Sequence, residues 1–235
     1  MSAVSSIPVL KMRAEQAEAN ILRACDDADL PGAITQDVFQ DEHVDDDGNR
    51  FPYTQTYYTC GSCTGIDADE VRLEFKQLIT QLTRRSAFLT MYGLFEHCMV
   101  GCLSVMDHLF GEITGKPFKY IADCHRRLTG TFGGDGIRDL DHLSAIRNIM
   151  AHNDGVADAY RDRLKPNSKT SPSQKQYFSA IRRAMDENAG IAVNSLNCVL
   201  MDSRFLAYAA GEFERYVGEL EAAVYHYREQ NPGRP

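Results

Sequence analysis

The residues whose types and spacing could do chemistry lie in mid-chain: Arg147, Asn148 and His152. An arginine side chain is always charged and binds phosphate oxygens through paired N–H groups. A histidine side chain takes or gives a proton near neutral pH. Together they suit cleavage of a phosphodiester by the 2′-hydroxyl of RNA, in which one group moves the proton and the other stabilises charge on the phosphate oxygens. That reaction needs no metal ion, and the sequence indicates neither a metal nor a cofactor.

The same residues also have a purely structural interpretation. Asn148 and His152 are four positions apart and share one helix face, whereas Arg147 is rotated by about 140° from His152. A histidine five positions after an arginine arises readily by chance in a chain with 7 histidines. In the structural interpretation Arg147 pairs with Glu96 in a helical core, and His152 interacts with the dipole at the end of its helix. Both interpretations stay open at this point.

The segment around these residues has the pattern of a helix. Leu140, Leu143, Ile146 and Met150 recur at helical spacing, which predicts an apolar stripe facing a core. Gly155 is a stop signal shortly after the histidine. The segment therefore predicts a helix that ends close to His152.

A second stretch, Ser86 to Ile113, is apolar on nearly all sides, which predicts a central helix. Glu96 lies in its middle. Burying an unpaired carboxylate is costly, so Glu96 needs a partner.

The whole pattern predicts a mainly α fold with a small N-terminal β-prone excursion. Asp45 to Asn49 is a turn between two β-prone runs, and the glycine-rich loop 130–136 matches no phosphate-binding spacing. We expect an N-terminal helix with an acidic, β-prone extension over 1–66 and a helical domain over 67–230. Besides the helix that ends close to His152, the predicted helices cover 5–29, 67–82, 86–113, 120–128, 172–185 and 202–227, with β-prone runs at 34–40, 51–59, 191–193 and 198–200.

Charge and hydropathy bear on the partners and on the compartment. The 235-residue chain has a net charge of −8, but residues 1–70 hold 14 acidic and 4 basic side chains and residues 71–235 hold 19 and 21. The region with Arg147 and His152 is thus mildly basic, which is compatible with a nucleic-acid partner. No apolar run is long enough to cross a bilayer and no signal peptide is visible, so we expect a cytoplasmic protein without a membrane partner.

Two segments have alternative metal-binding interpretations. The acidic run at 45–49 lacks the final glutamate of a calcium loop and is better interpreted as a solvated turn. Cys60 and Cys63 form a CxxC pair that would need a second ligand pair, for which Cys98 and Cys102 are candidates. The simpler interpretation is a Gly-Ser turn between two thiols, and the sequence leaves metal binding there open.

Two segments resemble the HEPN superfamily. Arg147-Asn148 followed by His152 resembles its Arg-(polar)-x-x-x-His signature, and Arg84 to Glu96 resembles the first core helix of several branches. The resemblance covers about residues 70–229 as a helical layout. It implies a helical bundle, a homodimer in which two motifs share one cleft, and metal-independent RNase activity in toxin–antitoxin, abortive-infection or CRISPR defence systems. Other members are non-catalytic RNA- or nucleotide-binding or protein-assembly modules, which is the alternative function.

The resemblance also assigns roles. Arg147 would bind and polarise the phosphate, His152 would transfer the proton, Asn148 would orient the site, and Glu96 would position Arg147 or His152. Some toxin branches carry a tyrosine two positions after the histidine, where this chain has Asp154. This difference would place an anion near the expected phosphate.

The expected partners are RNA, a second copy of the chain, and an antitoxin or a protein of a defence complex. Basic residues on both sides of the motif are candidates for binding RNA. They are Arg126, Arg127, Arg161, Arg163 and Lys165.

Overall fold

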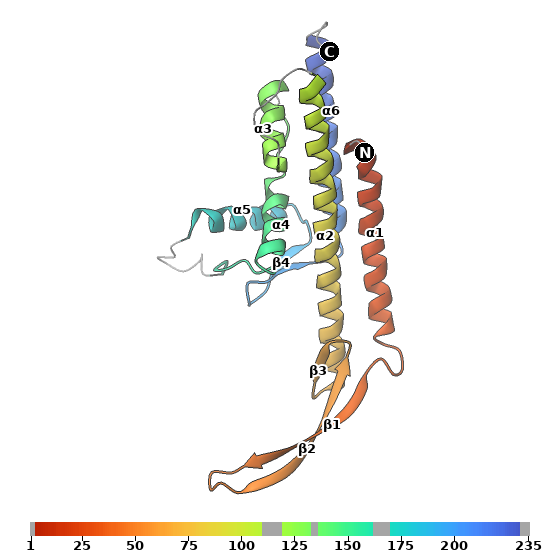
Figure 1. The fold of residues 1–235 in the computed structure, drawn as a ribbon, viewed down its shortest axis with the longest axis vertical. Helices are drawn as coiled ribbons and strands as arrows, with labels where there is room; N and C mark the ends of the chain where they lie inside the picture. The colour runs from red at the N-terminus through yellow and green to blue at the C-terminus, as the bar shows by residue number, and fades with distance from the viewer. Residues whose placement is uncertain (1–2, 110–118, 133–135, 162–169, 231–235) are drawn as a thin grey trace. The chain divides into compact units, whose positions relative to one another are not determined.

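The structure is a computed structural model that describes residues 3–109, 119–132, 136–161 and 170–230. These residues form six helices and five short or medium strands (Figure 1). The mainly α fold with a small β excursion is therefore confirmed. In chain order the elements are α1 (Ala3–Asp27), β1 (Thr35–Val44), β2 (Arg50–Cys60), β3 (Cys63–Gly65), α2 (Ala68–Leu109), α3 (Ile121–Phe132), α4 (Asp141–His152), α5 (Pro172–Asp186), β4 (Ile191–Val193), β5 (Val199–Met201) and α6 (Phe205–Gln230).

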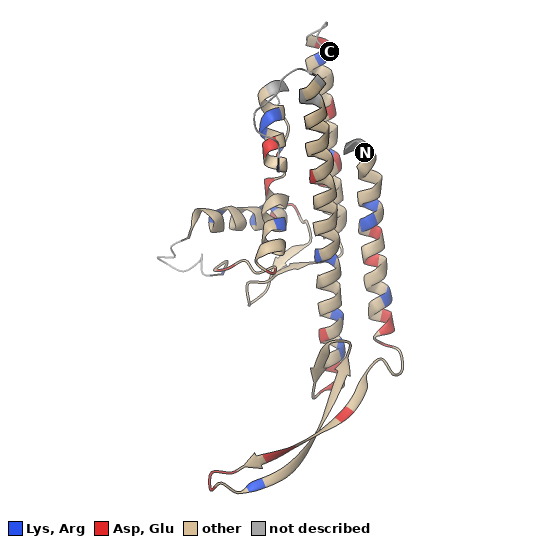
Figure 2. Ribbon diagram, in the orientation of Figure 1, with Lys and Arg blue, Asp and Glu red and all other residues tan. Residues whose placement is uncertain are grey.

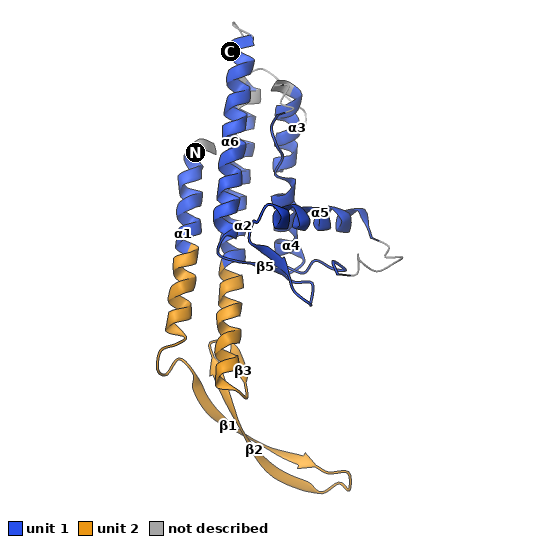
Figure 3. Cartoon of the chain, turned by 180° about the vertical axis from the view of Figure 1, so that it is seen from behind, with its two compact units in different colours: residues 1–16, 84–235 blue, residues 17–83 orange. Residues whose placement is uncertain are grey.

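The chain divides into two compact units, shown in different colours in Figure 3. Unit 1 comprises residues 1–16 and 84–235, and unit 2 comprises residues 17–83. Unit 2 thus contains the β-rich segment together with the end of α1 and the beginning of α2. The sequence-based domains, 1–66 and 67–230, divide the chain by composition and stay a prediction.

Unit 2 contains the predicted hairpin. β1 and β2 are antiparallel, from the pair Thr35 with Thr59 to the pair Val44 with Arg50. The acidic run forms the turn: Asp45 Oδ1 accepts the backbone N–H groups of Asp47 (3.1 Å) and Asn49 (2.8 Å). These hydrogen bonds, first among them those from Asn49, lower the pKa of Asp45. The acidic residues at the tip of the hairpin, red in Figure 2, therefore form a turn, as predicted.

A small core closes the base of the hairpin in unit 2. Cys60 and Cys63 are buried together with Ala28 and Val71, and Phe75 packs against them. Gly61 has a φ of +58°, and a side chain there would overlap the Phe75 ring. The Gly-Ser turn between the two thiols is thus fixed by local packing, because only glycine fits the backbone and the space.

In unit 1, α2 and α6 form the aromatic core. The Phe95 and Phe213 rings stack with their centroids 4.4 Å apart. Phe88 meets Phe205 edge to face at 4.9 Å. The first part of α1 is joined to α6 by Lys11 Nζ, which donates to Glu214 at 2.8 Å. These contacts explain why the middle of α2 is apolar on nearly all sides, as predicted for a central helix.

The prediction of two separate helices over 67–82 and 86–113 is wrong in one respect, because α2 is a single helix of 42 residues. No glycine or proline lies between Leu82 and Ser86 to interrupt it. The last predicted residues, 110–113, lie outside the described part. From Ala68 to Val105, α2 is long and apolar enough to cross a membrane by length and composition, so the prediction that no apolar run reaches this length is wrong. In unit 1 its largest apolar side chains are buried against α6.

The remaining elements of unit 1 hold α4. The predicted helix over 172–185 is present as α5, and it begins with a capping box in which Ser171 and Gln174 exchange hydrogen bonds. The predicted strand pair is present as β4 and β5. α3 extends to Phe132 and includes part of the loop predicted from 130, of which residues 133–135 lie outside the described part. The apolar face of α4 is buried, as its stripe predicts: His142, Leu143, Ala145, Ile146, Ile149 and Met150.

Candidate functional site

The four residues predicted to form the site line one pocket of unit 1. The pocket has a volume of about 390 Å³. Glu96 reaches it from α2, whereas Arg147, Asn148 and His152 reach it from α4. The other residues that line it are Tyr92, Tyr120, Ala122, Asp141, Ser144, Gln176 and Tyr177.

Arg147 is held by three neighbours. Its Nη2 donates to Glu96 Oε2 at 3.3 Å, and its Nη1 donates to Asn148 Oδ1 at 2.9 Å. The guanidinium also lies over the Tyr92 ring, with its carbon 5.4 Å from the ring centroid, a favourable cation–π geometry. The side chain is 26% exposed. A guanidinium has five N–H donors, so this arrangement orients Arg147 and leaves donors for a ligand.

Glu96 and Tyr92 are themselves anchored. Glu96 Oε1 accepts the backbone N–H of Ile121, at the start of α3, at 3.4 Å. The Tyr92 hydroxyl lies 2.7 Å from Ser144 Oγ, and Ser144 Oγ donates to the backbone carbonyl of Leu140. Burial, the largest cause, raises the pKa of Tyr92 to about 12, which keeps the phenol neutral. The partner that Glu96 was expected to need is thus Arg147, together with the beginning of α3.

His152 is the last residue of α4 and is exposed. Within the described part of the chain it makes no hydrogen bond or ion pair. The helix is regular up to this point, because Asn153 N donates to Ile149 O at 3.1 Å. His152 and Arg147 therefore reach the pocket from different sides of α4, and the imidazole is open to a ligand.

The backbone after His152 is fixed by a contact that the sequence did not suggest. Arg85 Nη1 donates to Asp154 Oδ1 at 2.7 Å, and Arg85 Nη2 donates to the Asp154 carbonyl at 2.8 Å. Gly155 follows with a φ of +78°, and a side chain there would overlap the Arg85 guanidinium. Asp154 is not among the residues that line the pocket, and its carboxylate binds Arg85. An anion beside the phosphate stays a prediction.

The predicted RNA-binding residues that the structure describes do not line this pocket. Arg126 lies near Asp123 on the same helix, with Nη1 3.6 Å from Oδ1. Arg127 is half-buried. Arg161 donates through Nε to the Asn194 carbonyl at 3.0 Å and so supports the loop between β4 and β5. Arg163 and Lys165 lie outside the described residues. RNA binding by these side chains stays a prediction.

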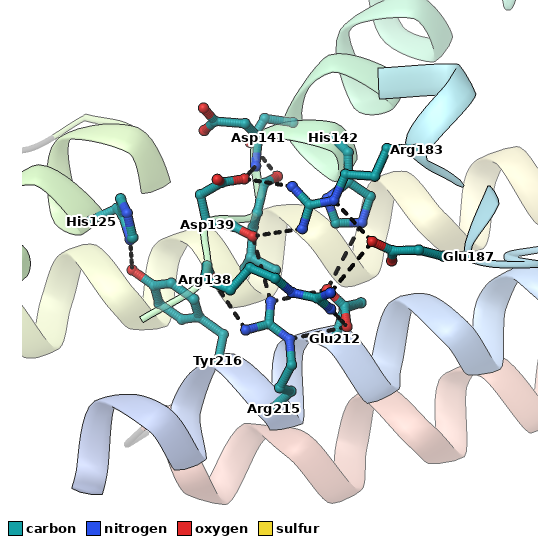
Figure 4. A network of polar contacts seen from close by, with 12 residues as sticks. His125, Arg138, Asp139, Asp141, His142, Arg183, Glu187, Glu212, Arg215 and Tyr216 are labelled. Carbon is teal, nitrogen blue, oxygen red and sulfur yellow. Dashed lines mark hydrogen bonds and ion pairs between the residues drawn. The ribbon is translucent and has the colours of Figure 1, made fainter. Parts of the chain in front are cut away.

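A second polar cluster lies at the other side of α4 (Figure 4). His142 is buried, and its Nε2 lies 2.8 Å from the Tyr208 hydroxyl. The Tyr208 hydroxyl also donates to Glu187. Burial is the main cause that lowers the pKa of His142 to about 4, and its Nδ1 has no hydrogen-bond partner among the described residues. The imidazole is therefore neutral in the folded protein at neutral pH.

This cluster has a ligand set that a metal could use, but its carboxylates are already bound. Ligand atoms of His142, Glu187 and Glu212 lie within 4.8 Å of one another. Glu212 accepts from Arg138 at 2.8 Å and from Arg215 at 2.9 Å, and Glu187 accepts from Arg183 at 3.1 Å. Three guanidinium groups compensate the carboxylates at this position, so the cluster ties α4, α5 and α6 together. No sequence signal pointed to it, since its members share no periodicity.

The CxxC pair also lacks the surroundings of a metal site. Cys60 and Cys63 are cross-strand neighbours and are buried. Burial is the largest cause that raises the pKa of the Cys63 thiol, which disfavours the thiolate that binds metals. Among the described residues no further histidine, cysteine or carboxylate completes a ligand group around them. These observations agree with the interpretation of the pair as a turn between two thiols.

The pocket thus combines an oriented, charged guanidinium with an open imidazole, and both are typical of sites that act on phosphates. Comparisons of the chain with protein-family models, with curated proteins and with solved structures find no match.

Proposed function

We propose that the chain is a HEPN-type endoribonuclease that cleaves RNA without a metal ion, as a cytoplasmic homodimer in a prokaryotic defence or toxin–antitoxin system. The observation that supports this function is that Arg147, Asn148, His152 and Glu96 line one pocket. Arg147 is held in a defined orientation there, and His152 keeps its imidazole open. An antitoxin or another defence protein would control such an activity.

In the proposed reaction the 2′-hydroxyl of the RNA attacks the adjacent phosphorus. A P–O bond to the 2′-oxygen forms and the P–O bond to the 5′-oxygen breaks, which leaves a 2′,3′-cyclic phosphate and a 5′-hydroxyl. An imidazole takes the proton from the 2′-hydroxyl or gives one to the leaving oxygen. The guanidinium of Arg147 donates hydrogen bonds to the non-bridging oxygens, where negative charge develops.

Each pocket offers one open imidazole, whereas the reaction moves two protons. A second copy of the chain would supply the second imidazole if two α4 helix ends face each other. The exposed position of His152 at the end of α4 is compatible with such a cleft, in which both Arg147 side chains would bind the same phosphate.

The test replaces the two central residues. His152→Ala and Arg147→Ala are expected to lower RNA cleavage by about 100-fold or more, since general acid–base catalysis contributes factors of this size. His226→Ala is the matched control, because it removes an exposed histidine that does not line the pocket and should leave cleavage unchanged. Circular dichroism checks that each variant is folded. Cleavage that persists in purified His152→Ala protein would refute the proposed function.

One observation favours the alternative, a non-catalytic HEPN-like module that binds RNA, a nucleotide or a protein. Glu96 and Asn148 already bind the guanidinium of Arg147, so its charge is partly compensated before any ligand arrives. Incubation of the purified protein with total RNA in EDTA distinguishes the two functions. The endoribonuclease produces fragments with cyclic phosphate ends, whereas the binding module produces a complex and intact RNA.

A further inference from the structure

The pocket extends well beyond Arg147 and His152. Asp141, Ser144, Asn148 and His152 lie within about 80° of one another around an ideal helix, so they form one stripe along α4. The stripe is about 16 Å long at 1.5 Å per residue. His152 lies at one end and Asp141 at the other, and all four residues line the pocket. A pocket of this length accommodates more of an RNA chain than the phosphate that is cleaved.

Asp141 presents an available carboxylate to this far end. Among the described residues its side chain has no hydrogen-bond or ion-pair partner. Its neighbour Asp139 accepts from Arg183 at 2.8 Å instead. In Figure 4 the Asp141 carboxylate points away from the Arg183 side chain. Burial, and next the charge of Asp139, raise the pKa of Asp141, and the charges of His125 and Arg183 offset this only in part.

Side chains with flat faces and with an amide line the same pocket as this carboxylate. Tyr120 precedes α3 and is 57% exposed. Tyr177 and Gln176 reach the pocket from α5. Aromatic rings stack on nucleobases of any sequence, and an amide side chain both donates and accepts hydrogen bonds. The pocket thus has the components of a nucleobase site, and Asp141 lies about 9 Å along the helix axis from Arg147.

We propose that the far end of the pocket binds a guanine base of the RNA, with Asp141 as the residue that selects it and Tyr120 as the surface on which it stacks. A carboxylate accepts two parallel hydrogen bonds from a group with two adjacent donors. Guanine offers such a pair, its N1–H and its exocyclic amino group. Adenine and cytosine offer an amino group beside a ring nitrogen that is an acceptor, and uracil offers one N–H between two carbonyl oxygens. The ionised carboxylate therefore favours guanine.

Binding of guanine does not depend on the proposed function. Only its consequence, a preference for cleavage next to a guanine, rests on that function. The binding itself is tested separately. Guanosine 5′-monophosphate and uridine 5′-monophosphate are titrated into the wild-type protein by isothermal titration calorimetry. We expect guanosine monophosphate to bind about tenfold more tightly or better, because one good bidentate pair gives discrimination of at least this size.

Two variants separate selection from stacking. Asp141→Asn should bring the ratio of the two affinities close to one, because the amide no longer accepts both hydrogen bonds. Tyr120→Ala should weaken the binding of both nucleotides about tenfold and keep their ratio. Asp186→Asn is the control for loss of charge, since Asp186 is exposed at the end of α5 and does not line the pocket. It should leave both affinities unchanged. Thermal unfolding checks that the variants are folded.

The outcomes are distinguishable. Equal affinities in the wild type, or a guanine preference that survives in folded Asp141→Asn protein, would overturn the inference even if the protein cleaves RNA. A guanine preference that Asp141→Asn removes supports the inference even if no RNA is cleaved, in which case the proposed function is wrong. If the protein does cleave, mapping of the fragment ends should show cleavage next to guanine in the wild type and relaxed positions in Asp141→Asn.

Discussion

The segment just after His152 offers a sharp test, the substitution Gly155→Ala. Gly155 has a φ of +78°, a conformation that costs an L-residue about 1–2 kcal/mol. A methyl group there would also overlap the Arg85 guanidinium and separate it from Asp154. That ion pair contributes about 0–1 kcal/mol, because the Asp154 side chain is 95% exposed. The substitution should therefore lower the free energy of unfolding by about 2 kcal/mol in all.

Both stability and cleavage report the effect. A loss of about 2 kcal/mol lowers the melting temperature of a chain of this size by about 4–8 °C. Gly155 is also tied to its neighbours by hydrogen bonds from its N–H to Ile149 O (3.0 Å) and from Val199 N to its carbonyl (2.8 Å). A strained alanine at this position would thus move the end of α4, and with it His152. A displacement of about 1 Å at a reacting group costs about 100-fold in rate, so cleavage should fall more than stability.

A second glycine provides the control. Gly211 lies in α6, is exposed, and has open space where a side chain would begin. Gly211→Ala should raise the free energy of unfolding by about 0.5–1 kcal/mol, because alanine restricts the unfolded chain and favours the helix. Arg85→Ala combined with Gly155→Ala removes the overlap but keeps the backbone strain and still lacks the ion pair to Asp154, so its free energy of unfolding should stay close to that of Gly155→Ala. The reasoning is refuted if Gly155→Ala melts at or above the wild-type temperature.

Two further predictions concern Glu96 and His142. Glu96→Gln keeps a hydrogen bond to Arg147 but removes the negative charge beside it, so it should lower the free energy of unfolding by about 1–2 kcal/mol. It should also lower kcat more than it changes KM. An unchanged kcat would exclude a positioning role for Glu96. For His142, burial holds the folded pKa at about 4 against an ordinary 6.5, so the unfolded chain binds a proton that the folded chain excludes. The free energy of unfolding should thus fall by about 3 kcal/mol as the pH drops from 6.5 to 4. Urea unfolding at pH 7 and pH 5 should show much of this loss in the wild type and little in His142→Gln. The neighbouring carboxylates Asp139 and Glu187 contribute little in this range, because their pKa values are lowered and they titrate at more acidic pH. An equal loss in the variant would contradict the assignment of the pH dependence to His142.

Much of the local structure could be predicted from sequence because it depends on near neighbours. The apolar stripe of α4, the turn at 45–49, the cap at Ser171 and the strand pair near 191 and 199 all follow from periodicity and turn residues. The helix break near residue 84 was predicted wrongly, because the change in pattern there reflects a change in burial along one helix, not an end of the helix. The pairing of Arg147 with Glu96 was foreseen from chemistry alone, since a carboxylate in an apolar helix needs a partner.

The sequence by itself determined which side chains α4 presents along one face, because the helical period fixes their directions. Only the tertiary structure decided what they meet. Arg85 and Asp154 are 69 positions apart, and Asp141 shares its pocket with residues from the segment before α3 and from α5. Such contacts depend on how helices pack against one another, which is set by the fit of many side chains together and not by any local pattern. For the same reason the cluster around His142 left no signal in the sequence, although several ion pairs and hydrogen bonds hold it together (Figure 4).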